Sequence, residues 1–161
     1  MHTETPRLPM RREPRPTTTP QTPHIQLDQH APVGLQAELW ERMIALDGVQ
    51  EGRSGVSAPS SRALHLRQDL ADGPRQAFFA GTEFAHLHGD GSGSMHLSLP
   101  LDVVEQLFAA GWGEQHPIVK LGGPPNWVML FGPRDQAELD VVWGLVQASY
   151  AFARGEEVAV G

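Results

Sequence analysis

The stretch from Thr82 to Leu99, TEFAHLHGDGSGSMHLSL, decides how the centre of this chain folds. Both of its ends alternate apolar and polar residues, which is the pattern of a half-buried β-strand. Between them lies a loop of five residues, 89–93, three of which are glycines. This combination predicts an antiparallel β-hairpin.

The alternation gives the predicted hairpin an apolar face and a histidine face. A symmetric loop pairs residue 86 with residue 96, and directly paired side chains point to the same side of a sheet. We expect one face in the protein core, and it carries Ala85, Leu87, Met95, Leu97 and Leu99. The opposite face carries Phe84, His86, His88, Ser94, His96 and Ser98. On this register Glu83 lies on the apolar face.

Helical periodicity predicts three helices around the hairpin. The first runs from about Val33 to Leu46, and the second from Leu101 to Ala110. Asp135 and Glu138 have the spacing of a capping box, which opens a last helix ending near Arg154.

Two further apolar stretches, Ala63–Leu66 and Trp127–Phe131, are typical of strands. The Gly-, Ser- and Pro-rich stretch Gly52–Ser61 is predicted to be mainly loop. The fold class is therefore α+β: an antiparallel sheet packed by an N-terminal, a middle and a C-terminal helix. We expect a single domain over residues 31–155 and a flexible tail at 156–161.

The N-terminal part of the chain differs in composition from the rest. Residues 1–32 contain seven of the fourteen prolines, together with four arginines and few apolar side chains. Dense prolines disfavour regular structure, and so few apolar residues offset little of the entropy lost on ordering. This composition predicts a disordered arm over residues 1–30.

Overall composition excludes several classes of function. The chain has 161 residues, a net charge of −7 and no cysteine. An acidic domain is a poor match for the phosphates of nucleic acid, and a chain without cysteine has no disulfide, thiolate metal site or cysteine nucleophile. Because it also lacks a long apolar run, we expect a soluble, cytoplasmic domain. Its expected partner is a small-molecule substrate rather than nucleic acid or a membrane, and its oligomeric state is left open.

The histidine face has three interpretations. His86 is predicted to lie directly opposite His96, with His88 on the same strand face. Imidazoles transfer protons near neutral pH and also bind divalent metal ions. The face is then a solvated or structural surface, an acid–base site, or a metal site formed by His86, His88 and His96.

Four segments together resemble the small luciferase-domain family, which takes its name from similarity to fungal luciferase and has small bacterial members. The resemblance covers about residues 33–155. The segments that carry it are Glu83–His88, Met95–Pro100, Gly111–Pro117 and Asn126–Arg134.

The resemblance implies a compact α+β domain that oxidises an electron-rich hydroxypyrone with O2, without an obvious need for flavin or metal. The matching catalytic candidates are His86, His88, His96 and His116, with Glu114 beside them. Fungal luciferase is longer than this chain, and a shared fold does not transmit a substrate.

We therefore expect a cofactor-independent oxygenase that acts on a flat enol, phenol or hydroxypyrone-like metabolite, with O2 as co-substrate. Its substrate-binding candidates are Phe84, Trp112, Trp127 and Ser98. Two alternatives remain at the same histidines: a non-catalytic domain that binds a small molecule, and an enzyme that depends on a divalent metal.

Overall fold

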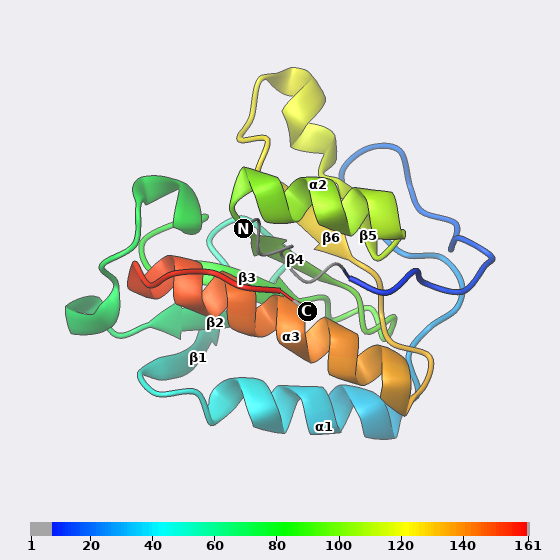
Figure 1. Ribbon diagram of the computed structural model, residues 1–161, viewed down its shortest axis with the longest axis horizontal. Coiled ribbons are helices and arrows are strands. Elements are labelled where there is room, and N and C mark those ends of the chain that lie inside the picture. The colour runs from blue at the N-terminus through cyan, green and yellow to red at the C-terminus, as the bar shows by residue number, and fades with distance from the viewer. Residues whose placement is uncertain (1–7, 161) are drawn as a thin grey trace, which may run out of the picture.

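The computed structural model describes residues 8–160 (Figure 1). Three α-helices are present: α1 (Val33–Ile44), α2 (Leu101–Ala110) and α3 (Gln136–Arg154). Short 3-10 helices lie at η1 (Gln68–Leu70), η2 (Arg75–Ala77) and η3 (Pro117–Leu121). The strands are β1 (Val49–Arg53), β2 (Arg62–Leu66), β3 (Glu83–Leu87), β4 (Met95–Ser98), β5 (Gly113–Gln115) and β6 (Trp127–Leu130).

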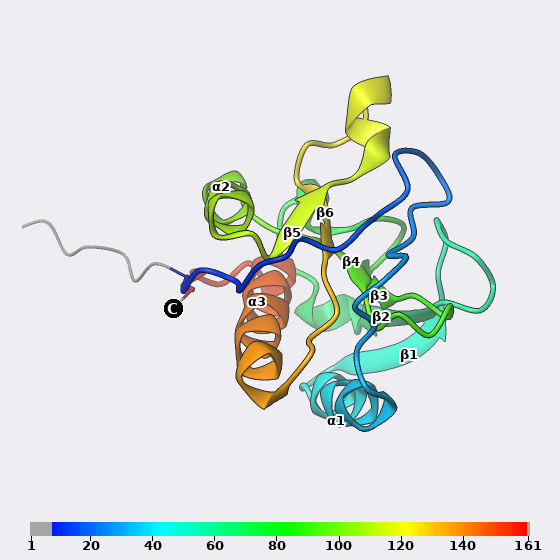
Figure 2. The ribbon, with the colours of Figure 1, turned by 90° about the vertical axis from the view of Figure 1, so that its right-hand side faces the viewer.

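The six strands form one antiparallel sheet in the order β1-β2-β3-β4-β6-β5. Figure 2 shows α2 and α3 on one side of this sheet, with residues of the N-terminal segment crossing its other side. The α+β class predicted from the sequence is confirmed. Within residues 8–160, no helix is both long enough and apolar enough to cross a membrane.

The central hairpin has the predicted register. His86 pairs with His96, Ala85 with Leu97 and Leu87 with Met95. The apolar face of this hairpin is buried and belongs to the same core cluster as the inward faces of α1, α2 and α3. Alternation along the two strands therefore places the histidines on the face that points away from the helices.

A β-bulge corrects the expectation for Phe84 and Glu83. Leu64 of β2 pairs with Ala85, but the next residue, His65, pairs with Glu83, so Phe84 is an extra residue on β3. Such an insertion interrupts the alternation of side chains. Phe84 therefore joins the core, where it is fully buried. Glu83 instead lies on the histidine side, with its Oε2 2.9 Å from Nδ1 of His86.

Helix boundaries follow local signals that the sequence displays. The Asp135 carboxylate accepts a hydrogen bond from the Glu138 amide at 2.9 Å, which is the predicted N-terminal cap of α3. Gly155 ends this helix in the left-handed conformation, with φ of 73°. The strands β1 and β5 were not predicted.

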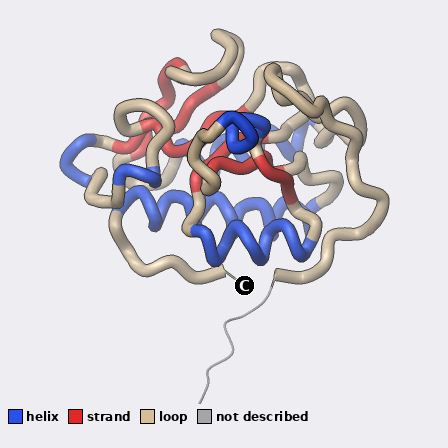
Figure 3. The backbone as a smooth tube through the Cα atoms, turned by 90° about the horizontal axis from the view of Figure 1, so that it is seen from above, coloured by secondary structure: helices blue, strands red, loops and turns tan. Residues whose placement is uncertain are grey.

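Residues 8–30, which the composition placed in a disordered arm, lie against the domain. They form neither helix nor named strand and belong to the tan loops of Figure 3. Hydrogen bonds replace apolar burial here: the Arg11 amide donates to the Ala110 carbonyl, and the Gly132 amide donates to Oε1 of the fully buried Gln26. Residues 1–7 lie outside the described part of the chain.

The C-terminal segment, expected to be a flexible tail, also contacts the domain. Val158 packs against the core, and the buried Val160 belongs to it. Residue 161 lies outside the described residues.

Candidate functional site

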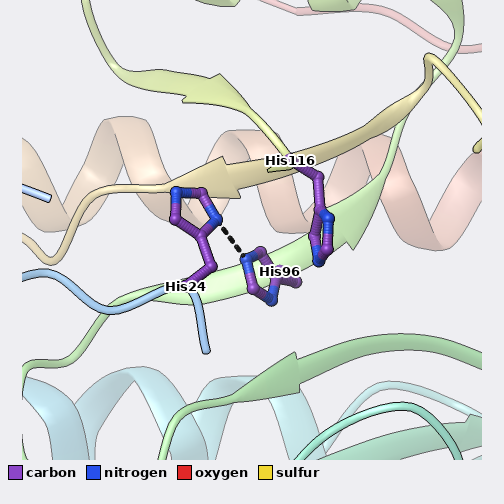
Figure 4. A group of neighbouring side chains, drawn as sticks. All are labelled: His24, His96 and His116. Carbon is purple, nitrogen blue, oxygen red and sulfur yellow. Dashed lines mark hydrogen bonds between the residues drawn. The ribbon is translucent and has the colours of Figure 1, made fainter. Parts of the chain in front are cut away.

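Five imidazoles meet on the face of the sheet opposite the core. His96 on β4 is at their centre, and its Nε2 lies 2.9 Å from Nδ1 of His24. The Nδ1 atom of His96 lies 3.1 Å from Nε2 of His86 and 3.0 Å from Nε2 of His88. The ring of His116 packs beside His96 with 4.4 Å between centroids. Figure 4 shows His24, His96 and His116, which come from three separate parts of the chain.

The backbone explains how these side chains converge. His86 and His96 are directly paired on β3 and β4, and the His88 amide donates to the Ser94 carbonyl two residues further along each side of the hairpin. His116 follows β5, and its Nδ1 accepts a hydrogen bond from the Ile118 amide at 3.0 Å, which caps η3. His24 arrives from the N-terminal segment.

The Glu83 carboxylate supports one side of this imidazole cluster, which comprises His24, His86, His88, His96 and His116. Glu83 is fully buried and contacts His86 at 2.9 Å, and it accepts hydrogen bonds from the Ser54 hydroxyl and the Gly55 amide. Burial by itself raises the pKa of Glu83, but these hydrogen bonds outweigh burial, so the pKa is lowered. Glu83 is therefore an ionised carboxylate at neutral pH.

A second carboxylate, Glu114, lies on the other side of the cluster. Its Oε2 is 3.6 Å from Nε2 of His24 and 3.5 Å from the Arg15 guanidinium. Burial raises the pKa of Glu114, while the nearby His24 and Thr18 side chains and the charge of Arg15 lower it more. Glu114 thus also carries a negative charge at neutral pH.

Three imidazoles of the cluster, His88, His96 and His116, have lowered pKa values and are neutral at neutral pH. Burial, together with the neighbouring histidines, lowers the pKa of His88 to about 4 and that of His116 to about 4. Burial is also the largest reason why the pKa of His96 lies well below its usual value. Removing water penalises the cationic form, and several imidazoles at close range penalise it further.

A cavity of about 520 Å³ opens onto the cluster. His24, His86, His88, His96 and His116 all line it. The remaining wall is mostly apolar and includes Ile25, Val56, Phe79, Ile118 and Trp127. This volume is in the range of cavities that enclose small molecules, and a few polar groups at one end of an apolar cavity fix the orientation of a ligand.

The structure brings together most of the residues predicted to be catalytic. His86, His88, His96 and His116 line the cavity, whereas Glu114 reaches the cluster through His24. Of the four residues predicted to bind substrate, Trp127 lines the cavity.

The other three candidates lie elsewhere. Phe84 is in the core because of the bulge. Trp112 is buried and its indole donates to the Pro9 carbonyl at 2.6 Å. The Ser98 hydroxyl donates to the Ala77 carbonyl at 2.5 Å.

The sequence did not point to several residues of the site, among them His24, Glu83 and Phe79. His24 lies in the segment expected to be disordered, and Glu83 was assigned to the opposite face. Phe79 lies in an irregular loop after η2, where no periodicity marks it. A polar Glu at the start of an otherwise apolar strand face was the one signal that pointed to an irregularity at Glu83.

The fold and the cavity define an α+β domain with a candidate small-molecule site. Residues 81–149 match the family model described as the luciferase domain. This segment of the chain is therefore similar to the luciferase-domain family. The segment contains four of the five imidazoles and both carboxylates, and His24 lies outside it.

Three fungal relatives show the extent of the similarity. A luciferase from Armillaria gallica is 32% identical over 81 residues, which is 48% of this chain and 30% of the relative. Luciferases from Armillaria ostoyae and Neonothopanus nambi are each 36% identical over 73 residues, or 44% of this chain and 27% of the relative. The chain thus matches less than a third of the length of these relatives. No solved structure gives a significant match to it.

Proposed function

We propose that this domain is a small-molecule oxygenase that oxidises a flat enol or phenol, such as a hydroxypyrone, at the imidazole cluster. The observation that carries the proposal is that five imidazoles line a mostly apolar cavity of about 520 Å³. Similarity of residues 81–149 to fungal luciferases supports an oxidation as the type of reaction.

The apolar wall suits a flat ring. Phe79 and Trp127 meet edge to face with 4.6 Å between centroids, and Phe79 lies 5.4 Å from the ring of His86. Aromatic side chains in this arrangement offer both ring faces and ring edges to a planar ligand. In this proposal the hydroxyl of such a ligand points to the imidazoles, which are polar groups of the cavity wall.

The cluster can take up the proton that an enol releases. Glu83 beside His86 and Glu114 near His24 are both ionised, so they stabilise the positive charge that the imidazoles gain. The resulting enolate is rich in electrons at carbon. Positioned acid–base groups of this kind contribute about 10²–10⁴-fold to a rate.

The oxidation balances without a further reactant. The enolate carbon gives an electron pair to O2 and forms a C–O bond, and O2 is reduced to the level of a peroxide. The proton held by the cluster then moves to the outer oxygen. The product is a hydroperoxide that contains all atoms of the substrate and of O2.

Oxygen consumption tests this function. We expect purified protein to consume O2 with one or more members of a panel of 4-hydroxy-2-pyrones and catechols. His96→Gln should reduce the rate by about 100-fold or more, because His96 contacts three of the other imidazoles at hydrogen-bond distance. His65→Gln is the matched control, because His65 lies on β2 and contacts the Arg53 carbonyl instead.

Two results would contradict the oxygenase. One is binding of these compounds in the cavity with no consumption of O2, which favours a domain that only binds small molecules. The other is an oxidation rate that His96→Gln leaves equal to that of His65→Gln.

A further inference from the structure

We propose that Nε2 of His86, Nε2 of His88 and Nδ1 of His96, which line the cavity, bind one divalent first-row transition-metal ion. One ring nitrogen from each of these three residues lies within 4.8 Å of a ring nitrogen of the other two. The inference deepens the proposed function, because a bound ion supplies the positive charge that the cluster otherwise gains as a proton. The existence of the site does not depend on turnover.

The separations between the nitrogens fit a shared ion. Two nitrogens that each lie about 2.1 Å from one ion are about 3.0–3.4 Å apart for angles of about 90° to 109° at the ion. Nδ1 of His96 lies 3.1 Å from Nε2 of His86 and 3.0 Å from Nε2 of His88. Both separations therefore match cis ligands of one ion.

In His86 and His88, the outer nitrogen, which is the ring nitrogen that does not face the ion, has the partner that a metal-bound histidine requires. Nδ1 of His86 lies 2.9 Å from the Glu83 carboxylate, which has no hydrogen to donate. This nitrogen therefore carries the hydrogen, and in the neutral ring Nε2 keeps its lone pair for an ion. Nδ1 of His88 lies 2.8 Å from the Ser94 hydroxyl, which can accept its hydrogen.

The outer nitrogen of His96, Nε2, is connected through His24 to the Glu114 carboxylate. If Nδ1 of His96 binds the ion, its Nε2 carries a hydrogen and donates to Nδ1 of His24, 2.9 Å away. Nε2 of His24 then also carries a hydrogen, and it faces Glu114 Oε2 at 3.6 Å. Every outer N–H of the three ligands thus points to an acceptor.

Without a positive charge at the three nitrogens, the hydrogen bonds from His96 through His24 to Glu114 cannot all form. With the hydrogen of His86 on Nδ1 and that of His88 donated to Ser94, Nδ1 of His96 then donates toward His86 and His88, so its Nε2 accepts from His24. Nε2 of His24 becomes an acceptor that faces the Glu114 carboxylate. The His24 side chain is 1% exposed, and its Nε2 has no hydrogen-bond partner within 8–160. Two buried acceptors that face each other are unfavourable. An ion bound at Nδ1 of His96 removes this arrangement, because Nε2 of His24 then carries a hydrogen toward Glu114.

A second group of three imidazoles, His24, His96 and His116, is also close enough to hold an ion. In this group, however, ring nitrogens that would have to bind the ion carry hydrogens. Nδ1 of His116 accepts from the Ile118 amide at 3.0 Å, so the neutral ring carries its hydrogen on Nε2. That nitrogen is a donor and not a ligand. His24 and His96 already share a hydrogen between their facing nitrogens.

The proposed site leaves positions on the ion open to the cavity. Three protein ligands with one or more free positions are the arrangement of catalytic rather than structural metal sites. Imidazole ligands suit zinc, copper, iron and nickel. A free position next to Phe79 and Trp127 would take the enolate oxygen of the substrate.

Metal titration of untagged protein tests the site. After treatment with EDTA and its removal, we expect calorimetric titration with Zn²⁺ to give one ion per chain. Co²⁺ should give the visible absorption of a nitrogen-ligated ion. His88→Gln removes a ligand near the hairpin loop, where His88 is only half-buried, and should weaken Zn²⁺ binding by at least about 100-fold. Glu83→Gln should weaken it by about 10–100-fold, as loss of such an outer partner does.

Two further variants separate this site from the alternative group. His116→Gln and the matched control His65→Gln should keep the affinity within about threefold. The inference is overturned if folded wild-type protein binds no stoichiometric Zn²⁺, or if binding survives His88→Gln and is lost in His116→Gln.

The test also separates the metal site from the proposed function. A bound ion in a protein that consumes no O2 with any compound of the panel supports the site and contradicts the oxygenase. Full O2 consumption by protein that binds no metal overturns the site and leaves the oxygenase in place.

Discussion

Nδ1 of His24 lies 2.9 Å from Nε2 of His96, although 72 residues separate the two along the chain. This contact makes the N-terminal segment part of the candidate site, because His24 links the imidazole cluster to Glu114. The segment also forms part of the cavity wall through Pro23 and Ile25. Residues outside the matched luciferase domain therefore contribute to the site.

Deleting residues 1–30 should lower the melting temperature. The deletion removes the partners of the Trp112 indole and of the Gly132 amide, which bond to Pro9 and Gln26. Each buried donor left without a partner costs about 1–3 kcal/mol. Thermal unfolding followed by circular dichroism measures the effect. An unchanged melting temperature would mean that residues 8–30 are not held on the domain.

Leu97→Ala should cost about 2–5 kcal/mol of unfolding free energy, since it leaves a cavity in the core. Leu97 is fully buried between β3, β6 and the helices. His96→Gln, one residue earlier on the opposite face, should cost much less. Urea denaturation of both variants measures the difference. The reverse order would contradict the assignment of the two faces of the hairpin.

Stability of the metal-free protein should rise with pH between about 4 and 6.5. The pKa of His88 and that of His116 are about 4 in the folded protein, against the ordinary value of 6.5 in an unfolded chain. Between these values the unfolded chain binds more protons, so acid favours unfolding. Urea midpoints across this range test the slope, which should be smaller in His88→Gln than in wild type. Equal slopes would show that His88 is not held neutral by the fold.

Two glycine substitutions should have opposite effects. A Cβ on Gly113 would lie 2.1 Å from the Met129 carbonyl oxygen, so Gly113→Ala must disturb the pairing of β5 with β6. We expect a loss of about 1–3 kcal/mol, as for other overpacked positions. Gly144, inside α3, has no atom within 4 Å of an added Cβ. Gly144→Ala should therefore stabilise the protein by about 0.5–1 kcal/mol, and a destabilised Gly144→Ala would contradict this packing.

Trp127→Leu should weaken the binding of 4-hydroxy-2-pyrones, whereas Trp112→Phe should not. Trp127 lines the cavity, while Trp112 is buried where its indole meets Pro9. Trp112→Phe should instead reduce stability by about 1–3 kcal/mol, because it leaves the Pro9 carbonyl without its donor. Calorimetric titration gives the two dissociation constants. A Trp112→Phe variant that folds but no longer binds would place the ligand elsewhere.

The amino-acid sequence by itself determined the hairpin, its register and the boundaries of the helices. Alternation from Ala85 to Leu99, a glycine-rich loop and the cap at Asp135 act over a few residues, so they can be recognised without knowing what lies nearby. This local information already placed His86 opposite His96, and the structure has the same pairing.

Only the tertiary structure decided which other residues join these two histidines. The bulge at Phe84 depends on how β3 pairs with β2, and it moves Glu83 to the histidine side. The docking of residues 8–30 depends on hydrogen bonds to distant backbone groups such as Gly132, and it delivers His24 to His96. Such contacts leave no periodic trace in the sequence, because each one joins single residues that lie far apart along the chain.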